Sequence, residues 1–421
     1  MSKKTSWWKK IASILGPGFI TGAADDDPSG IATYSQTGAM FGFSQLWIVL
    51  FTYPFMVVVQ EMCGRIGLVT GRGLSGVIKR HYSRTLLYGV LAILFLANAI
   101  NIGADLGAMA ASAQLILPVP LVPLLVAVTG LILVLEIFVP YPKYARLLRY
   151  LTLSLLAYVV TVFIIGQDWA LIARSTLIPT LIFSKEYLLN IVALLGTTIS
   201  PYLFFWQADE EVEEEIADHR LVAIGQGKPK FTDTDVRAMR VDTATGMFFS
   251  QLITFFIMIT VASTIGPGRI VATAAEAAEA LRPVAGNAAF LLFTLGIFGT
   301  GLLAIPVLAG STAYAFSEAF DRKAGLGRRP KDALFFYGMI VLVTLVGVGA
   351  TFLPIPPITL LYYSAVLNGI LAPPLMVLIL LIAKNKKVMG DRTNSVLSNI
   401  LGWTITLVMG GVAIALVSTM V

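Results

Sequence analysis

Long apolar segments separated by short polar loops run along almost the whole chain. At about 20 apolar residues per bilayer crossing, the pattern predicts eleven membrane-spanning helices, at 11–40, 45–64, 86–115, 121–139, 147–166, 187–207, 245–265, 286–316, 333–353, 357–383 and 396–420. Composition agrees, because 57% of the residues are hydrophobic and 13% are charged, unlike the balance in soluble globular proteins. We therefore expect an all-α polytopic membrane protein whose main surroundings are lipid.

The placement of lysine and arginine indicates the topology. Of the 30 basic residues, 26 lie in loops that share one side if the N-terminus is cytoplasmic, and the exceptions are Arg174, Lys185, Arg269 and Arg282. Positive loops favour the cytoplasmic side, and a missed span would reverse every later loop. We expect a multi-pass protein of a prokaryotic-type plasma (inner) membrane, with its N-terminus cytoplasmic and its C-terminus outside. Anionic lipid accounts for the net charge of +6 without a nucleic-acid partner.

Residues able to carry enzyme or cofactor chemistry are scarce. The single Cys63 excludes a disulfide framework, and His81 and His219 each stand beside basic residues, as solvated loop histidines do. No nucleophile with its base and no nucleotide-binding motif appears. We expect neither an enzyme nor a resident cofactor, and no obligatory protein partner is evident.

The first apolar segment is interrupted by Gly22–Gly30, with the sequence GAADDDPSG. Each ionised Asp at helix-centre depth costs about 2.5–3.5 kcal/mol even on the mildest insertion scale. Pro28 lacks an amide hydrogen and disfavours helix at Asp27, while Gly22 and Gly30 loosen the backbone. Unwound backbone at membrane depth is tolerated where it is buried or lines a wet cavity. We therefore interpret the segment as a break in the first helix, with Asp27 at the centre of a cation site.

The sixth segment carries a second interruption, at Thr197–Tyr202 (TTISPY). Two interrupted helices at matching places of two halves mark the substrate site of inverted-repeat transporters. The predicted units are a first repeat over 1–166, a second repeat over 167–385 and a peripheral eleventh helix over 386–421. An ordinary proline kink at Pro201 is the alternative.

At these motifs the chain resembles the NRAMP divalent-metal transporters. Gly16–Phe19 (GPGF) with Asp27–Gly30 (DPSG) is similar to the GPGF and DPGN of that family. The stretch from Val58 to Arg72 is similar to its second-helix ending, where LGIATGK is typical, and Thr198–Tyr202 falls where it has TVMPH. The resemblance covers all eleven predicted spans and is specific in the first, second and sixth. It implies a leucine-transporter-type 5+5 inverted repeat and secondary transport of a divalent cation by alternating access.

The resemblance also implies a ligand set, and this chain departs from it. The Asp is kept as Asp27, but Gly30 replaces the Asn and Ser200 replaces the Met. A Met thioether favours soft transition metals, so its loss leaves oxygens from Asp27 and Ser200 and the carbonyls of Ala24 and Thr197. A roomy oxygen-lined site suits Mg²⁺, which keeps several waters. The chain looks like the NRAMP-related magnesium transporter branch.

Proton coupling is the second departure. The sixth-helix His of the family is Tyr202 here, with a reference pKa near 10. The acidic pair of the third helix aligns best with Asn101 and Ala104, whereas a shifted alignment would use Asp105. We therefore expect uncoupled flux. Thr198 and Asn368 are further candidates near the site; Asn368 would touch the hydration shell of the ion or form an ordinary interhelical hydrogen bond.

Other acidic residues leave several interpretations open. Asp25 and Asp26 would supply charge next to the site or face a vestibule. The run 209–215 would be a solvated start of a cytoplasmic helix or an acidic patch at the exit of a cation path. Gln60 and Glu61 are expected at the end of the second span, and Glu136 at the cytoplasmic interface beside Lys143 and Arg146.

The sequence thus predicts Mg²⁺ transport that tolerates Mn²⁺. The main alternative is a proton-coupled importer of Mn²⁺ or Fe²⁺. An organic-substrate carrier is disfavoured because the carboxylates at the first break would repel a substrate carboxylate. A metal-gated sensor is disfavoured because no appended cytoplasmic domain is evident.

Overall fold

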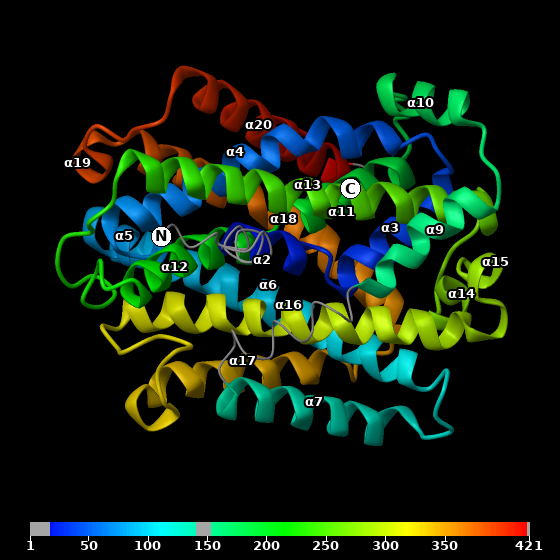
Figure 1. Ribbon diagram of the computed structural model, residues 1–421, viewed down its shortest axis with the longest axis horizontal. Coiled ribbons are helices and arrows are strands. Elements are labelled where there is room, and N and C mark those ends of the chain that lie inside the picture. Colours follow the sequence, from blue (N-terminus) through cyan, green and yellow to red (C-terminus); the bar gives the residue numbers. More distant parts are fainter. Residues whose placement is uncertain (1–16, 140–152, 419–421) are drawn as a thin grey trace, which may run out of the picture.

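The computed structural model describes residues 17–139 and 153–418, and every regular element in these ranges is a helix. Figure 1 shows the helices as one bundle along a common long direction. In chain order they are α2 (Pro17–Asp25), α3 (Pro28–Phe41), α4 (Leu46–Thr70), α5 (Leu74–His81), α6 (Arg84–Ala113), α7 (Leu121–Phe138), η1 (Leu153–Leu155), α9 (Leu156–Ile164), α10 (Trp169–Leu177), α11 (Lys185–Thr198), α12 (Pro201–Ala217), α13 (Asp233–Thr264), α14 (Ala274–Glu279), α15 (Arg282–Ala285), η2 (Gly286–Ala288), α16 (Ala289–Ala319), η3 (Pro330–Asp332), α17 (Leu334–Ala350), α18 (Pro357–Lys384), α19 (Lys386–Met389) and α20 (Val396–Ser418).

The predicted all-helical membrane architecture is confirmed. Within the described ranges eight helical stretches are long and apolar enough to cross a membrane, and α17 is a shorter apolar helix. The first predicted span, 11–40, corresponds to α2 and α3 from residue 17 onward, and the described part of 147–166 corresponds to η1 and α9. The total of eleven spans stays a prediction.

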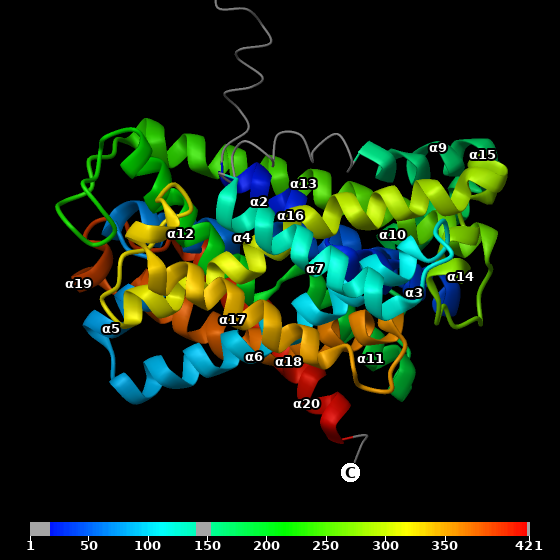
Figure 2. The same ribbon diagram turned by 90° about the horizontal axis from the view of Figure 1, so that it is seen from below.

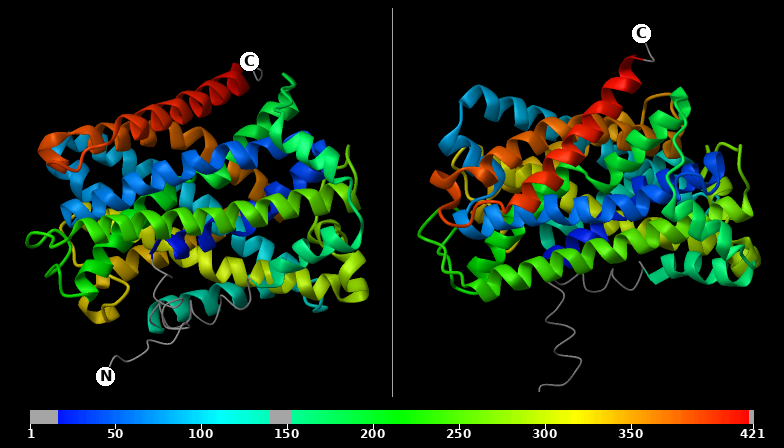
Figure 3. Two further views of the ribbon diagram at one scale, coloured as in Figure 1. Left: turned by 45° about the horizontal axis from the view of Figure 1, so that its top comes forward. Right: turned by 90° about the horizontal axis from the view of Figure 1, so that it is seen from above.

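The short connecting helices gather at the two ends of the bundle. Figures 1 and 2 place α5 and α19 at one end and α14 and α15 at the other. The first pair belongs to segments predicted to be cytoplasmic and the second pair to segments predicted to lie outside. In the left view of Figure 3, α20 (red) runs along the edge of the bundle.

Close backbone contact between α2 and α13 positions the first broken helix. A Cβ atom on Gly18 would lie 2.5 Å from the Thr243 nitrogen, and one on Gly22 would lie 2.3 Å from the Gly246 carbonyl carbon. Small residues spaced by four let two membrane helices approach in this way. Gly22 was expected to loosen the backbone at the break; in the structure it allows this close approach.

We expect Gly22→Ala to lower stability strongly, because its methyl group would overlap Gly246 backbone atoms rather than a flexible side chain. Overpacking of this kind costs about 1–3 kcal/mol. Thermal unfolding of the purified protein in detergent measures the effect. Gly89→Ala in α6 is the matched control, since a Cβ there meets nothing within 4 Å. Equal unfolding temperatures for the two variants would contradict the importance of the α2–α13 contact.

Three expectations about acidic residues change. Gln60 and Glu61 lie inside α4, which continues to Thr70, and Glu61 forms ion pairs with Arg65 at 2.9 Å and with Arg240 at 2.8 Å. They were expected at the helix end, but the helix hydrogen bonds continue for two more turns. These pairs join the polar ends of α4 and α13.

The run 209–215 is not a solvated helix start. It continues α12, which begins at Pro201, and Asp209, Glu211 and Glu215 are buried. The solvated interpretation is wrong for these three residues because neighbouring helices cover that face of α12.

Glu136 is also buried rather than interfacial, with both carboxylate oxygens unpartnered within the described ranges. Its expected neighbours, Lys143 and Arg146, lie outside the described residues.

His81 and His219 are exposed, as expected. Although His81 is exposed, part of its imidazole ring is covered. This loss of hydration, together with the charges of Arg80 and Arg72, lowers the pKa of His81.

Candidate cation site between the two broken helices

The first break separates α2, which ends at Asp25, from α3, which begins at Pro28. Asp27 is the N-cap of α3 in extended backbone conformation, with φ −67° and ψ 172°. Its Oδ1 accepts hydrogen bonds from the Gly30 amide at 2.7 Å and the Ser29 hydroxyl at 2.6 Å. Proline is favoured directly after an N-cap, and the positive end of the helix dipole stabilises the carboxylate. The sequence Asp-Pro-Ser-Gly therefore breaks the helix and orients the Asp27 carboxylate in one local step.

The second break separates α11 from α12 at Ile199 and Ser200. It is an interruption and not a kink in a continuous helix. The Ser200 hydroxyl donates to the carbonyls of Gly196 at 2.7 Å and Thr197 at 2.9 Å. Because the hydroxyl proton is donated to carbonyls of α11, the lone pairs of the Ser200 oxygen remain available to a cation or to a water bound to one. Thr198 donates its hydroxyl to the Leu194 carbonyl of its own helix.

The two breaks meet in the centre of the protein. The Ser29 and Thr197 hydroxyl oxygens are 3.5 Å apart, and the Tyr202 hydroxyl donates to the Ala24 carbonyl at 3.0 Å. All four of these residues are buried. The structure thus brings the Asp27 break and the Ser200 break together, as the two-break hypothesis requires.

Helix α6 contacts the Asp27 carboxylate directly, and α18 contacts it through a side chain of α6. The Asn101 amide nitrogen on α6 donates to Asp27 Oδ2 at 3.0 Å and to Asp105 Oδ2 at 3.1 Å. On α18, the Asn368 amide donates to Asn101 Oδ1 at 3.1 Å. Asn101 therefore touches Asp27 directly, and Asp105 lies one side chain further away. Asn368 makes the interhelical hydrogen bond that was one of its two interpretations.

Asp25 and Asp26 face α13. The Ser250 hydroxyl donates to Asp25 Oδ2 at 2.6 Å and approaches Asp26 Oδ1 at 3.3 Å. Both aspartates are buried, which excludes an open vestibule around them in this structure. Asp25 Oδ1 has no hydrogen-bond partner in the part of the chain that the structure describes.

Tyr34 is a neighbour of the site that the sequence reasoning missed. A Cβ atom on Gly30 would lie 3.1 Å from the Tyr34 hydroxyl oxygen and from a carbon of its ring. The ring thus occupies space beside Gly30, so the site is less roomy there than expected. The spacing of four residues on α3 is the signal that could have identified this contact.

The chemistry of this arrangement is that of one central carboxylate among neutral oxygens. Within residues 17–139 and 153–418, no group of three or more His, Cys, Asp or Glu side chains is placed to hold a metal. Asp27 accepts from Ser29, Gly30 and Asn101, and the Ala24 carbonyl accepts from Tyr202. A cation that keeps part of its water shell fits such a donor set, because Mg²⁺ is usually held through one or two carboxylates.

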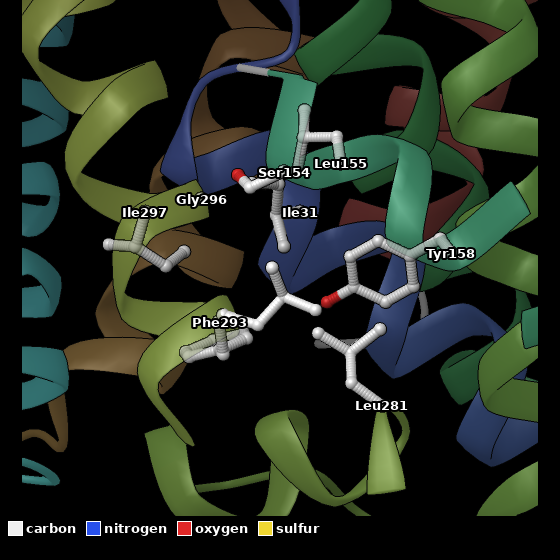
Figure 4. Close-up of a pocket in the computed structure, with 9 residues that line it drawn as sticks. Ile31, Ser154, Leu155, Tyr158, Leu281, Phe293, Gly296 and Ile297 are labelled. Carbon is white, nitrogen blue, oxygen red and sulfur yellow. The ribbon is translucent and has the colours of Figure 1, made fainter. Parts of the chain in front are cut away.

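A separate apolar pocket lies beside the site and is not part of it. Figure 4 shows Ile31, Tyr158, Leu281, Phe293 and Ile297 around it, together with Ser154, Leu155 and Gly296. Its side-chain oxygens come from Ser154 and Tyr158 alone, so this lining lacks the carboxylate that a cation site needs.

Comparison with solved structures gives the fold. The crystal structure of an Eremococcus coleocola manganese transporter in complex with an aromatic bis-isothiourea substituted compound superposes with a TM-score of 0.72, at 17% identity over 99% of this chain and 89% of that one. The inward-facing conformation of Mhp1 gives 0.57, at 14% identity over 96% and 91%. The chain thus has the fold shared by these leucine-transporter-type proteins.

Sequence comparison gives the family. The divalent metal cation transporter MntH of Yersinia enterocolitica is 28% identical over 95% of this chain and 93% of its own length. MntH of Klebsiella pneumoniae is 26% identical over 94% and 92%. These relatives are metal ion transporters, not enzymes. The family model of natural resistance-associated macrophage protein-like proteins matches residues 18–419, and the chain therefore belongs to the Nramp family.

Proposed function

We propose that this protein carries Mg²⁺, and also Mn²⁺, across the plasma membrane by alternating access. The observation that carries the proposal is that the second break lies against the first at Ser29, while α6 donates a hydrogen bond to the Asp27 carboxylate. Asp27, Ser200 and the carbonyls of Ala24 and Thr197 would bind the partly hydrated ion. The units 1–166 and 167–385 would move against each other as two inverted repeats, with 386–421 peripheral and the N-terminus cytoplasmic.

The preference for Mg²⁺ follows from the donors. Oxygen ligands suit hard cations, whereas a thioether suits softer ones. Gly30 and Ser200 stand where the resemblance would place an Asn and a Met. Among its relatives the chain would then belong to the magnesium-transporting branch, and the bulk removed at Ser200 would admit water bound to the ion.

Transport without proton coupling is the second part of the proposal. Tyr202 bonds the Ala24 carbonyl and Asn101 bonds the Asp27 carboxylate, so the side chains that touch the site oxygens from α12 and α6 are neutral. The gradient and the membrane potential would drive the ion, the latter by about 2.3 kcal/mol per charge per 100 mV.

The test is cation uptake into proteoliposomes that contain the purified protein and a pH dye in the lumen. We expect Mg²⁺ and Mn²⁺ to enter while the luminal pH stays constant, because no proton accompanies the ion. Protein-free liposomes are the control for leakage. Uptake of Mn²⁺ without Mg²⁺ would contradict the selectivity, and luminal acidification proportional to Mg²⁺ uptake would contradict uncoupled transport.

The alternative is a proton-coupled importer of Mn²⁺ or Fe²⁺. Two observations favour it: the relatives are named as divalent metal and manganese transporters, and Asp105 shares the Asn101 amide with Asp27. Asp105→Asn distinguishes the two functions. If acidification occurs in the native protein and disappears in this variant, the alternative is correct.

A further inference from the structure

Asp209 is a buried carboxylate that the central site does not use. It lies on α12, about 12 Å along the helix from Pro201 at 1.5 Å per residue. Its side chain is 1% exposed, and neither carboxylate oxygen has a hydrogen-bond partner in the described parts of the chain. Burying an unpaired carboxylate is strongly unfavourable. Such a group either takes up a proton or has its charge compensated by a cation from outside the polypeptide.

Glu318 is a second carboxylate in the same place, and it is held firmly. It stands near the end of α16 and accepts hydrogen bonds from the Gly73 amide at 2.9 Å, the Gly76 amide at 3.0 Å and the Ser75 hydroxyl at 3.0 Å. These donors form the N-terminus of α5, where the helix dipole favours negative charge. The position of this carboxylate is thus set by three donors.

The two carboxylates meet over Gly73. A Cβ atom on that residue would lie 1.9 Å from Asp209 Oδ1 and 2.6 Å from Glu318 Oε2. The missing side chain of Gly73 leaves the space in which the oxygens approach each other. Two ionised carboxylates this close repel each other unless a proton or a cation lies between them.

The nearby side chains do not neutralise Asp209. The carboxylates of Glu318, Glu213 and Glu210 act on it electrostatically and add negative charge. The Arg72 guanidinium donates to the Gly225 carbonyl at 2.8 Å, and Lys79 pairs with Asp321 at 2.5 Å. Arg72 also acts electrostatically on Glu318, but neither base donates to the oxygens of Asp209.

We propose that Asp209 and Glu318 bind a divalent cation at a second site, between the central site and the end of the bundle formed by α5. Two carboxylates with retained water are the donors that Mg²⁺ commonly uses. Because α12 runs from the Ser200 break to Asp209, an ion leaving the central site along this helix would reach the pair next. This inference rests on the proposed function, in that the chain carries a cation.

The experiment counts bound Mn²⁺ on the full-length protein in detergent by electron paramagnetic resonance. We expect two ions on the native protein, one on Asp27→Ala, and none on Asp27→Ala/Asp209→Asn at the same Mn²⁺ concentration. The second substitution should weaken the remaining binding at least tenfold, about 1.4 kcal/mol. Absence of a bound ion on Asp27→Ala, or its retention after Asp209→Asn, would overturn the proposal.

Two controls separate ligand loss from misfolding. Glu136→Gln in the Asp27→Ala background removes another buried carboxylate with two unpartnered oxygens and should leave the remaining ion bound. Asp209→Glu should restore binding that Asp209→Asn loses. If Asp209→Asn does not fold, Glu318→Gln in the Asp27→Ala background is the deciding variant. Loss of the bound Mn²⁺ would support the proposed pair, and its retention would contradict it.

Failure of this inference is distinct from failure of the proposed function. Binding at Asp209 is measured without transport, whereas the proposed function is measured as uptake by the native protein. A native protein that moves no cation but binds Mn²⁺ through Asp209 would refute the function and keep the site. If the native protein takes up cations but its Mn²⁺ binding does not depend on Asp209, the proposed function stands and the second site is refuted.

Discussion

Asp27→Ala is expected to abolish cation flux in proteoliposomes while the protein still folds. The variant removes the one side chain that α3, α6 and the Ser29 hydroxyl all hold in place. Removing one partner of a buried charge pair costs about 3–5 kcal/mol, which corresponds to an affinity loss of more than about 100-fold. Mg²⁺ uptake and Mn²⁺ binding measure the two consequences.

Asp168→Ala is the matched control for this variant. Asp168 is also an N-cap aspartate, with Oδ1 accepting from the Leu171 amide at 3.0 Å, but it caps the connecting helix α10. Its loss should cost about 0.5–2 kcal/mol of stability and leave transport unchanged. Full flux in Asp27→Ala would show that the ion does not use the carboxylate at the break, and the proposed function would fall.

Ser200→Met is expected to shift selectivity from Mg²⁺ towards Mn²⁺. A thioether at this break adds a soft ligand and removes the space for a water on the ion. We expect the ratio of Mn²⁺ to Mg²⁺ uptake to rise at least tenfold, about 1.4 kcal/mol. Competition of each ion against labelled Mn²⁺ uptake measures the ratio.

Ser200→Ala isolates the contribution of sulfur. It removes the hydroxyl that bonds Gly196 and Thr197 without adding a ligand. We expect slower transport with little change in the ratio of the two ions. An unchanged ratio in Ser200→Met would mean that the residue at this position does not set selectivity.

The hydrogen bonds at the proposed site would affect cation binding. The Ala24 carbonyl would bind a cation in exchange for the Tyr202 hydrogen bond, a bond worth about 0.5–1.5 kcal/mol net. The three donors to Asp27 fix the orientation of its carboxylate. In the proposed function, cation affinity would thus depend on residues that do not touch the ion, and Asn101 is the clearest example.

Local chemistry explains why both breaks were predictable. Apolar length marks a spanning segment, and a proline that follows a residue of a type favoured at helix N-caps favours an interruption. Asp27-Pro28 and Ser200-Pro201 show these features in the printed sequence, and the structure breaks the helices at both places. The resemblance to the family followed from the same short motifs.

The partners of these residues depend on how the helices pack. Asn101 reaches Asp27 because α6 lies against α3. Periodicity alone left the choice between Asn101 and Asp105 open, because residues four apart share a helix face. Both lie near the site for that reason.

Local sequence therefore determined that the chain forms long apolar helices, where two of them break and which carboxylate stands at the first break. Tertiary packing determined that Asp25 and Asp26 face Ser250, that Asp209 is buried and that Glu61 pairs with Arg240. An acidic run looks solvated in the sequence because its charges favour water. Burial is a property of the neighbouring helices, and these are separated from it by many residues along the chain.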